Sequence, residues 1–358
     1  MGIERYLGFH FTETCIYIAE AYVGRDKHLH WDVMEQANYE LEPEWLALYK
    51  DAIPNLYDTE KKVFGFAALP SIWRDFSYNR FLRFNSRFFE KIAQRKSSDD
   101  DQQKLANLFR YCQSSHIRPQ PDETLVATLV VEQLSSEDRT AIEQTLKQLS
   151  KKAKLEFIDV TEPEEACLRY LWYEDVHQQL EVEHKMVVLV HLGYSRTFMI
   201  PWDHGKLNDQ TTMAPGMLEI DRAVAMHAGR TGMSKTVGQD ELLLYAQRAR
   251  RGFDPDQNSV KILDAELETP IYLNIIQEQV TEISRRLERL LRNLKHWSRP
   301  VDEVLLAGEG IEFAPVRDAL QSASQGIPMR FLPQPTYAMA RGAASKSWKA
   351  RNRDVELR

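Results

Sequence analysis

The sequence of 358 residues predicts an α/β fold with two lobes, each built on a duplicated mixed sheet. From residue 125 onward, short apolar strands alternate with amphipathic helices, a pattern typical of α/β proteins. In addition, residues 7–27 and 189–206 share one pattern, which is a strand with a histidine near its end, a polar turn, a second strand and a second turn. This repeat predicts a duplicated domain, with 1–180 as the N-terminal lobe and 181–358 as the C-terminal lobe. The two polar turns are expected to face each other across a central cleft, where ligands normally bind.

The composition excludes several classes of protein. Hydrophobic residues make up 43% of the chain and charged residues 28%, as in folded globular proteins rather than disordered ones. A net charge of −7 is unlike the basic surface of proteins that bind nucleic acid. The apolar runs are far shorter than the ~20 residues of a transmembrane helix, and the charged N-terminal segment is unlike a signal peptide. Three cysteines without metal-ligand spacing predict reduced thiols and a cytoplasmic protein.

The N-terminal half holds the less regular elements. Residues 6–21 are β-rich, and a turn at 24–27 leads into 28–33, which predicts a hairpin. Residues 42–115 form an aromatic-rich insertion in which 73–89 alternates arginines with aromatic residues. This alternation resembles a surface that stacks nucleic-acid bases, but the acidic net charge favours a packed helix whose arginines extend to solvent. Residues 96–103 are expected to form a solvated, flexible loop.

The second half has a clearer order of strands and helices. Ser135 or Ser136 is expected to cap a helix, and Pro163 to begin the next one, a position at which proline is well tolerated. The apolar stripe of the helix at 281–297 indicates packing on a core rather than a coiled coil. The expected strands are 125–131, 155–160, 186–191, 198–201 and 301–307, and the expected helices are 136–149, one from 163, 240–251, 281–297 and 337–348.

Seven segments are similar, in order along the chain, to the motifs of one protein family. The best of them is 128–170, which has the family's strand, loop, helix, strand and helix start. The others are similar to the two phosphate hairpins, a glycine segment, the helix that borders adenine, the adenosine turn and the closing helix, and are 8–15, 191–196, 215–221, 247–251, 305–312 and 334–344. On these motifs the chain resembles the nucleotide-binding domain of the seventy-kilodalton heat-shock chaperones, within the actin-like ATPase superfamily. The resemblance implies the actin-like ATPase fold.

The resemblance also implies a set of nucleotide-binding residues. They are Thr12, Thr14, Gly193, Ser195, Gly216, Gln247, Arg250, Arg251, Gly308 and Gly310. Arg250 and Arg251 would flank or stack on a purine, although both equally fit solvated positions on a surface helix. Glu162 matches a family carboxylate that helps to place water and is the one catalytic candidate, and it equally fits a helix-entry residue without a catalytic role. The implied cofactor is ATP or ADP, bound weakly.

The sequence departs from the family where Mg²⁺ and the phosphates bind. Both magnesium-organising aspartates are replaced, by His10 and His191, and imidazole is a poor ligand for Mg²⁺. Tyr194 and Ser195 replace glycines, which restricts the backbone and fills phosphate space, and Glu13 opposes a triphosphate. Two facing histidines would bind an anion or a transition metal, but no third ligand is visible, and loss of function to hydrogen-bonded polar residues is the favoured interpretation. No metal site is therefore assigned, and Mg²⁺ is not expected.

These departures decide the expected function. Glu309 and Glu312 replace a glycine and an arginine at the adenosine turn, which weakens the match there as well. We expect a heat-shock-chaperone-like or actin-like pseudo-ATPase that acts through an unidentified protein partner, with weak or no hydrolysis of Mg-ATP. The alternatives are a divergent active ATPase or nucleotide-dependent switch, and an actin-like assembly scaffold that forms oligomers. No segment resembles the chaperones' substrate-binding domain, so a complete chaperone is not expected.

Overall fold

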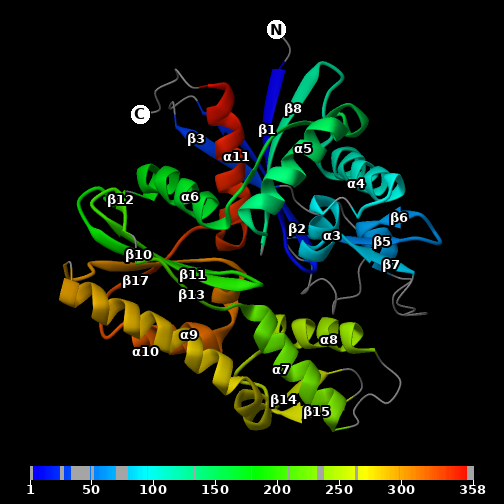
Figure 1. The fold of residues 1–358 in the computed structure, drawn as a ribbon. Coiled ribbons are helices and arrows are strands. Elements are labelled where there is room, and N and C mark those ends of the chain that lie inside the picture. The colour runs from blue at the N-terminus through cyan, green and yellow to red at the C-terminus, as the bar shows by residue number, and fades with distance from the viewer. Residues whose placement is uncertain are drawn as a thin grey trace. The chain divides into compact units, whose positions relative to one another are not determined.

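A computed structural model describes most of the chain. The described residues are 3–24, 28–33, 49, 52–69, 80–94, 96–132, 134–178, 180–208, 210–231, 238–262, 265–297 and 299–352. They form a mixed α/β structure, which confirms the predicted class (Figure 1). They divide into two compact units, of which unit 1 comprises the described residues within 1–40, 51–179 and 337–358, and unit 2 those within 41–50 and 180–336.

Unit 1 is built on a mixed sheet. Its strands are β1 (Ile3–Phe11), β2 (Cys15–Val23), β3 (Leu29–Val33), β4 (Ile53–Pro54), β8 (Glu123–Val131) and β9 (Glu156–Thr161). The strand order is β3-β2-β1-β8-β9, with β4 paired to β2. The first three strands form an antiparallel meander, and β8 and β9 continue the sheet parallel to β1. A second, smaller sheet contains β5 (Leu56–Asp58), β6 (Val63–Phe64) and β7 (Phe81–Arg83).

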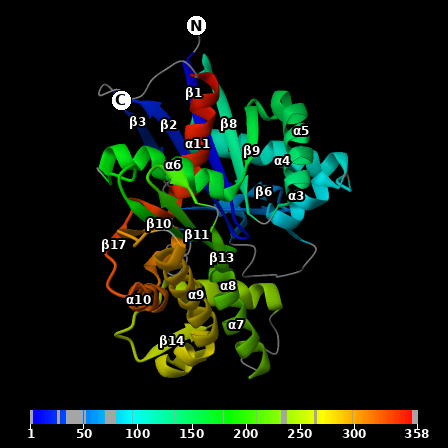
Figure 2. The same cartoon turned by 60° about the vertical axis from the view of Figure 1, so that its left-hand side comes forward.

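Helices cover both faces of the main sheet of unit 1 (Figure 2). They are α3 (Ser86–Ala93), α4 (Asp99–Cys112), α5 (Ser136–Ala153), α6 (Pro163–Gln178) and α11 (Ala338–Arg351), with short helical turns η1 (Gly65–Ala68) and η2 (Gln113–Ile117). Leu7, Phe9 and Phe11 of β1 point into an apolar core with α3, α4 and α5. Gly8 points to the opposite face, where α11 lies so close that a Cβ on Gly8 would stand 1.9 Å from the carbonyl oxygen of Ala340.

Unit 2 is built on a sheet with the same arrangement. Its strands are β10 (Met186–Leu192), β11 (Arg196–Asp203), β12 (Lys206–Leu207), β13 (Thr212–Pro215), β16 (Glu303–Ala307) and β17 (Met329–Phe331). The order is β12-β11-β10-β16-β17, with β13 paired to β11. As in unit 1, an antiparallel meander of three strands is followed by two parallel strands. The repeat predicted from the sequence is therefore present in the two sheets.

The helices of unit 2 pack around one apolar core. They are α7 (Met217–Arg230), α8 (Gln239–Arg251), α9 (Thr269–Trp297) and α10 (Ala314–Ala323), with the short helix η3 (Glu309–Glu312) and the hairpin of β14 (Ser259–Ile262) and β15 (Ala265–Glu268). The short helix η4 (Pro335–Tyr337) lies where the chain passes from unit 2 to unit 1. The apolar stripe of α9 is buried in this core, which confirms its predicted role, and consists of Ile283, Leu287, Leu290, Leu291 and Leu294.

The C-terminal helix packs differently from the expected division at 180/181. That division assigns residues 337–352 to the C-terminal lobe, whereas α11 packs on β1, β2, β8 and α6 of unit 1. The contact is specific, because Ser347 Oγ donates a hydrogen bond to the carbonyl oxygen of Leu7 at 2.9 Å. The chain therefore returns to unit 1 to complete the cover of its sheet.

Three expected elements need correction. The loop expected at 96–103 is wrong beyond Ser98, because α4 begins at Asp99 behind a capping box in which Ser98 and Asp101 bond each other's backbone N–H. The long helix α9 begins at Thr269 rather than at residue 281. In the segment 73–89, residues 73–79 lie outside the described part of the chain. Among the residues that are described, 81–83 form the strand β7 rather than the expected packed helix, and 86–89 belong to α3. In the predicted turn at 24–27, only Gly24 is described.

Candidate functional site

His10 and His191 occupy equivalent places in the two units. Each is the next-to-last residue of the first strand of its sheet, β1 or β10. Each lies between an antiparallel and a parallel strand, β2 and β8 for His10, and β11 and β16 for His191. Their neighbours along the strands point into the apolar cores, so the alternation of side chains places both imidazoles on the opposite face of their sheets. The equivalence proposed from the sequence therefore holds for the strand positions.

His10 is paired with a carboxylate that sequence reasoning missed. Its Nε2 lies 2.9 Å from Oε1 of Glu132, and each residue is only 3% exposed. Glu132 directly follows β8, and the carboxyl ends of neighbouring parallel strands meet at one edge of a sheet, so its position was a signal that could have identified it. One carboxylate with an imidazole fits Mg²⁺ poorly, because this ion prefers several oxygen ligands.

The first turn, at residues 12–14, is held by bonds within unit 1. Thr12 Oγ1 accepts hydrogen bonds from the backbone N–H groups of Cys15, at 3.0 Å, and Thr14, at 3.4 Å. The Glu13 carboxylate accepts hydrogen bonds from Asn85 and Ser86, at 2.7 Å each, where α3 begins. Thr12, one of the residues implied to bind nucleotide, thus stabilises the turn, and Glu13 ties the turn to the first residues of α3.

The second turn, between β10 and β11, is bonded to the first turn of α7. The N–H of Met217 donates to the carbonyl oxygen of Gly193 at 3.2 Å, and the N–H of Leu218 donates to that of Tyr194 at 2.8 Å. This approach requires glycine at position 216, because a Cβ there would stand 2.4 Å from the Tyr194 oxygen. Backbone amides at the start of a helix commonly bind phosphate. In unit 2 these two amides instead donate hydrogen bonds to carbonyl oxygens of the turn.

Two more glycines close around the same turn. Gly308 has a φ of 94°, and a Cβ there would stand 2.4 Å from the carbonyl oxygen of Leu192. A Cβ on Gly310 would meet Sδ of Met217 at 2.7 Å. The tertiary structure thus brings together around one turn five residues that the resemblance implied to bind nucleotide, namely Gly193, Ser195, Gly216, Gly308 and Gly310.

Tyr194 has a different role from the expected one. Its side chain is fully buried in the apolar core of unit 2, so the expectation that it fills phosphate space is wrong. Neither Tyr194 nor Ser195 has a left-handed φ, so their side chains do not strain the backbone. The guanidinium carbon of Arg250 lies 5.9 Å from the centre of the tyrosine ring, within the range of a cation–π contact.

Arg250 and Arg251 belong to a cluster of four charged side chains, of which Arg251 is the most exposed. Arg250 donates two hydrogen bonds to the Asp221 carboxylate, at 2.8 and 3.2 Å, and one to Glu309 at 3.3 Å. Arg251 donates to the other oxygen of Glu309 at 2.6 Å. Asp221 is fully buried and Arg250 almost so, and burial raises the pKa of Asp221 to about 6 despite the opposing charge of Arg250. For Arg250 the solvated surface position is therefore wrong, and its charge is committed to carboxylates of unit 2.

The remaining predicted residues lie in different settings. Gln247 is fully buried in α8. Glu162 is ion-paired with Arg139, and its side chain is half exposed. Its carbonyl oxygen accepts the N–H of Ala166 at 3.0 Å in the first turn of α6, which is the geometry of a helix-entry residue. The end of α8 also borders a cavity of about 210 Å³, whose lining includes Arg248 and Gly252 but not Arg250 or Arg251.

Comparison with known proteins adds no family to this description. No protein-family model matches the chain, and no curated protein matches it. Within the described residues, no group of three or more His, Cys, Asp or Glu side chains is arranged to hold a metal ion. None of the helices in the described part combines the length and apolar character that crossing a bilayer requires.

Proposed function

We propose that the chain has the actin-like ATPase fold and is a heat-shock-chaperone-like or actin-like pseudo-ATPase that acts through protein interaction. The fold proposal is supported by the shared strand order of the two sheets and by the equivalent positions of His10 and His191. Two sheets of one topology, each with a polar turn after its first strand, are what duplication of an ATPase domain would leave.

One observation carries the proposal that hydrolysis of Mg-ATP is weak or lost. Several polar groups of the residues that the resemblance assigns to phosphate and purine are already bonded within the protein. In unit 2 the first amides of α7 bond the turn, and Arg250 and Arg251 bond Asp221 and Glu309. A nucleotide that recruited these groups would break buried hydrogen bonds and ion pairs, and exposing or orphaning such groups costs several kcal/mol, roughly 3–5 for a buried pair.

Calorimetry on the purified chain tests this proposal. ATP and ADP are titrated with and without Mg²⁺, and phosphate release is followed in parallel. We expect weak binding at most, no strengthening by Mg²⁺ and no phosphate release above the rate in buffer. Turnover that is abolished by Glu162→Gln would overturn the proposal and support the active ATPase.

A restored variant supplies the matched comparison. His10→Asp with His191→Asp returns the two family carboxylates. Tighter, Mg²⁺-dependent binding by this variant alone would show that the histidines are what separates the chain from a nucleotide-binding relative. Light scattering on addition of nucleotide distinguishes the assembly scaffold, which would form larger particles, from the pseudo-ATPase, which would not.

A further inference from the structure

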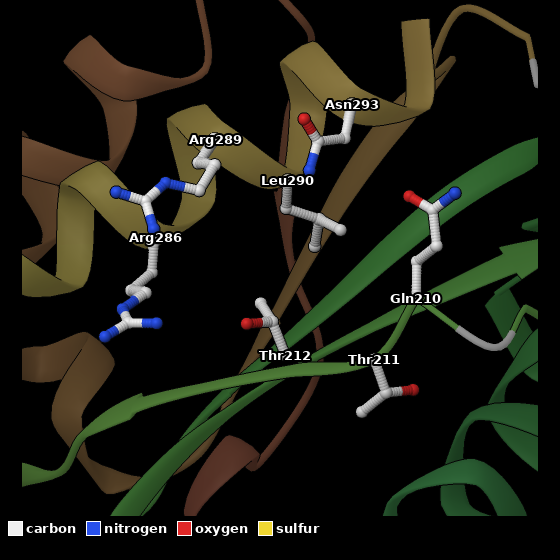
Figure 3. Close-up of a pocket in the computed structure, with 7 residues that line it drawn as sticks. All are labelled: Gln210, Thr211, Thr212, Arg286, Arg289, Leu290 and Asn293. Atoms are coloured by element: carbon white, nitrogen blue, oxygen red, sulfur yellow. The ribbon is translucent and has the colours of Figure 1, made fainter. Parts of the chain in front are cut away.

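A cavity of about 340 Å³ opens in unit 2 between α9 and the beginning of β13 (Figure 3). Its polar lining consists of Gln210, Thr211, Thr212, Arg286, Arg289 and Asn293, and one leucine completes it. None of these residues takes part in the turns or in the charge cluster described above. The volume is at the lower end of the range of small-molecule sites, which limits an occupant to a compact molecule.

The helix α9 supplies the charge of this cavity. Arg286, Arg289 and Asn293 follow one another at spacings of three and four residues, so they share one side of the helix. Leu290 between them is buried in the core and fixes which side faces the cavity. The lining that the structure describes therefore includes two guanidinium groups and no carboxylate.

The two arginines differ in how they are held. Arg286 Nε donates to Glu282 at 2.6 Å, one helical turn earlier, which orients its guanidinium. Arg289 is exposed and has no hydrogen bond or ion pair to any other residue in the described part of the chain. A guanidinium without a carboxylate partner, beside a second one that is already oriented, is suited to bidentate binding of an oxyanion.

The opposite wall adds neutral hydrogen-bonding groups in fixed positions. Thr212 is held by the pairing of β13 with β11, where its partner is Met199. In Figure 3 the hydroxyl oxygen of Thr212 points to the side on which Arg286 lies, and the amides of Gln210 and Asn293 are at the other end of the cavity. Hydroxyl and amide groups donate to an oxyanion and also bond the polar substituents of the molecule that carries it.

The surroundings favour the same class of occupant. Residues 285–299 contain six arginines and lysines and one acidic residue, whereas the whole chain has a net charge of −7. A local concentration of positive charge on an acidic protein attracts small anions to that surface.

We infer that this cavity binds a small organic oxyanion, a phosphate or carboxylate compound, whose charged group is held by Arg286 and Arg289 and oriented by Thr212. The site is separate from the proposed nucleotide-derived turns and does not depend on them. Arginine and threonine side chains bind phosphate and carboxylate groups alike, so an experiment has to distinguish a phosphate compound from a carboxylate compound.

The full chain is titrated by calorimetry at low salt with glycerol phosphate, inorganic phosphate and succinate. We expect saturable binding of at least one of them and about a tenfold or greater loss of affinity in Arg289→Gln, because a charge-assisted bond to the oxyanion is removed. Thr212→Val keeps the branched shape and removes the hydroxyl, and it should weaken binding less. Preference for glycerol phosphate assigns a phosphate compound, and preference for succinate a carboxylate.

Arg285→Gln is the matched control. Arg285 is an exposed arginine of the same helix that does not line the cavity, so its removal changes the net charge equally and should reduce affinity far less than Arg289→Gln does. Equal losses in Arg285→Gln and Arg289→Gln would mean general charge attraction and would overturn the proposal, as would the absence of saturable binding of all three probes. Unchanged unfolding transitions of both variants separate lost binding from lost folding.

Discussion

Arg250 lies inside unit 2, where its guanidinium joins the carboxylates of Asp221 and Glu309. Transferring charged groups from water into a protein interior is costly, and the pair persists because each charge has a partner with good geometry. Removing one member leaves the other buried and unpaired, which is far more costly than the absence of both. Arg250 thus stabilises the folded state of unit 2, and any nucleotide would have to compete with Asp221 for its guanidinium group.

Replacing Arg250 tests whether its pairing with Asp221 stabilises the folded state. Arg250→Leu should lower the free energy of unfolding by about 3–5 kcal/mol at pH 8, because Asp221 is left ionised and buried. At pH 5 the loss should be smaller, since the pKa of Asp221 is already raised to about 6 and the carboxyl is then protonated. Urea unfolding at the two pH values measures the difference. Arg251→Leu, a more exposed partner of Glu309, should cost less, and an equal loss at both pH values for Arg250→Leu would contradict this assignment.

Glu165 gives a second test with the opposite pH dependence. Burial raises its pKa, but hydrogen bonds from Lys346 and Thr161 outweigh burial and hold the pKa at about 2. The stability from this interaction is therefore present above the unfolded-state pKa, near 4.5, and is lost as pH falls toward 2. Lys346→Met should reduce stability by no more than about 1 kcal/mol at pH 7, because Glu165 is more than a third exposed. Acid titrations of both proteins should converge only as the pH reaches about 2, and a constant gap would count against the interaction.

At the scale of elements, α11 is fitted to unit 1 by small residues. A Cβ on Gly342 would stand 1.8 Å from the carbonyl oxygen of Ala166 in α6, and a Cβ on Gly8 would meet the backbone of α11 itself. Both contacts involve backbone, which cannot move aside like the end of a side chain. Glycine at these positions therefore sets the distance between helix and sheet and between the two helices (Figure 1).

Two helical glycines allow a paired prediction. Gly342→Ala should destabilise the protein by about 1–3 kcal/mol, because α11 must shift away from α6. Gly229→Ala in α7 meets only a leucine methyl group at 3.7 Å and should stabilise by up to about 1 kcal/mol through helix propensity. Thermal unfolding of the two variants compares them directly. If both variants were stabilised, or both destabilised, the close packing of α11 on α6 would not be what determines the effect of a Cβ at Gly342.

At the scale of the whole molecule, the two units have separate apolar cores, and unit 1 is discontinuous in sequence. One face of its sheet, the face that carries Gly8, is covered only when residues 337–352 return and pack on it. Unit 2 takes its sheet and its core from residues 186–331. Loss of the C-terminal helix should therefore affect the units unequally.

A shortened chain tests this inequality. A chain ending at residue 336 should lose hydrogen-exchange protection in β1 and β8, because the face that α11 covers becomes exposed to water. Protection in β10 and β16 should remain, since their core includes no residue of α11. A chain ending at residue 352 is the control and should keep both. Equal loss of protection in the two sheets of the shorter chain would refute the assignment of α11 to unit 1 alone.

The sequence by itself determined the α/β class, the repeat of two hairpins and the strand positions of His10 and His191, because these follow from local periodicity and turn residues. Only the tertiary structure decided that α11 completes unit 1, that Glu132 pairs with His10, and that Arg250 is buried beside Asp221. Each of these joins residues far apart in the chain. The position of Glu132 directly after β8 was a local signal for the edge of the sheet, but no local pattern specifies which two side chains pair there. The cavity beside α9 is also decided by the tertiary structure, because Thr212 and Arg286 line one cavity only when β13 and α9 pack together.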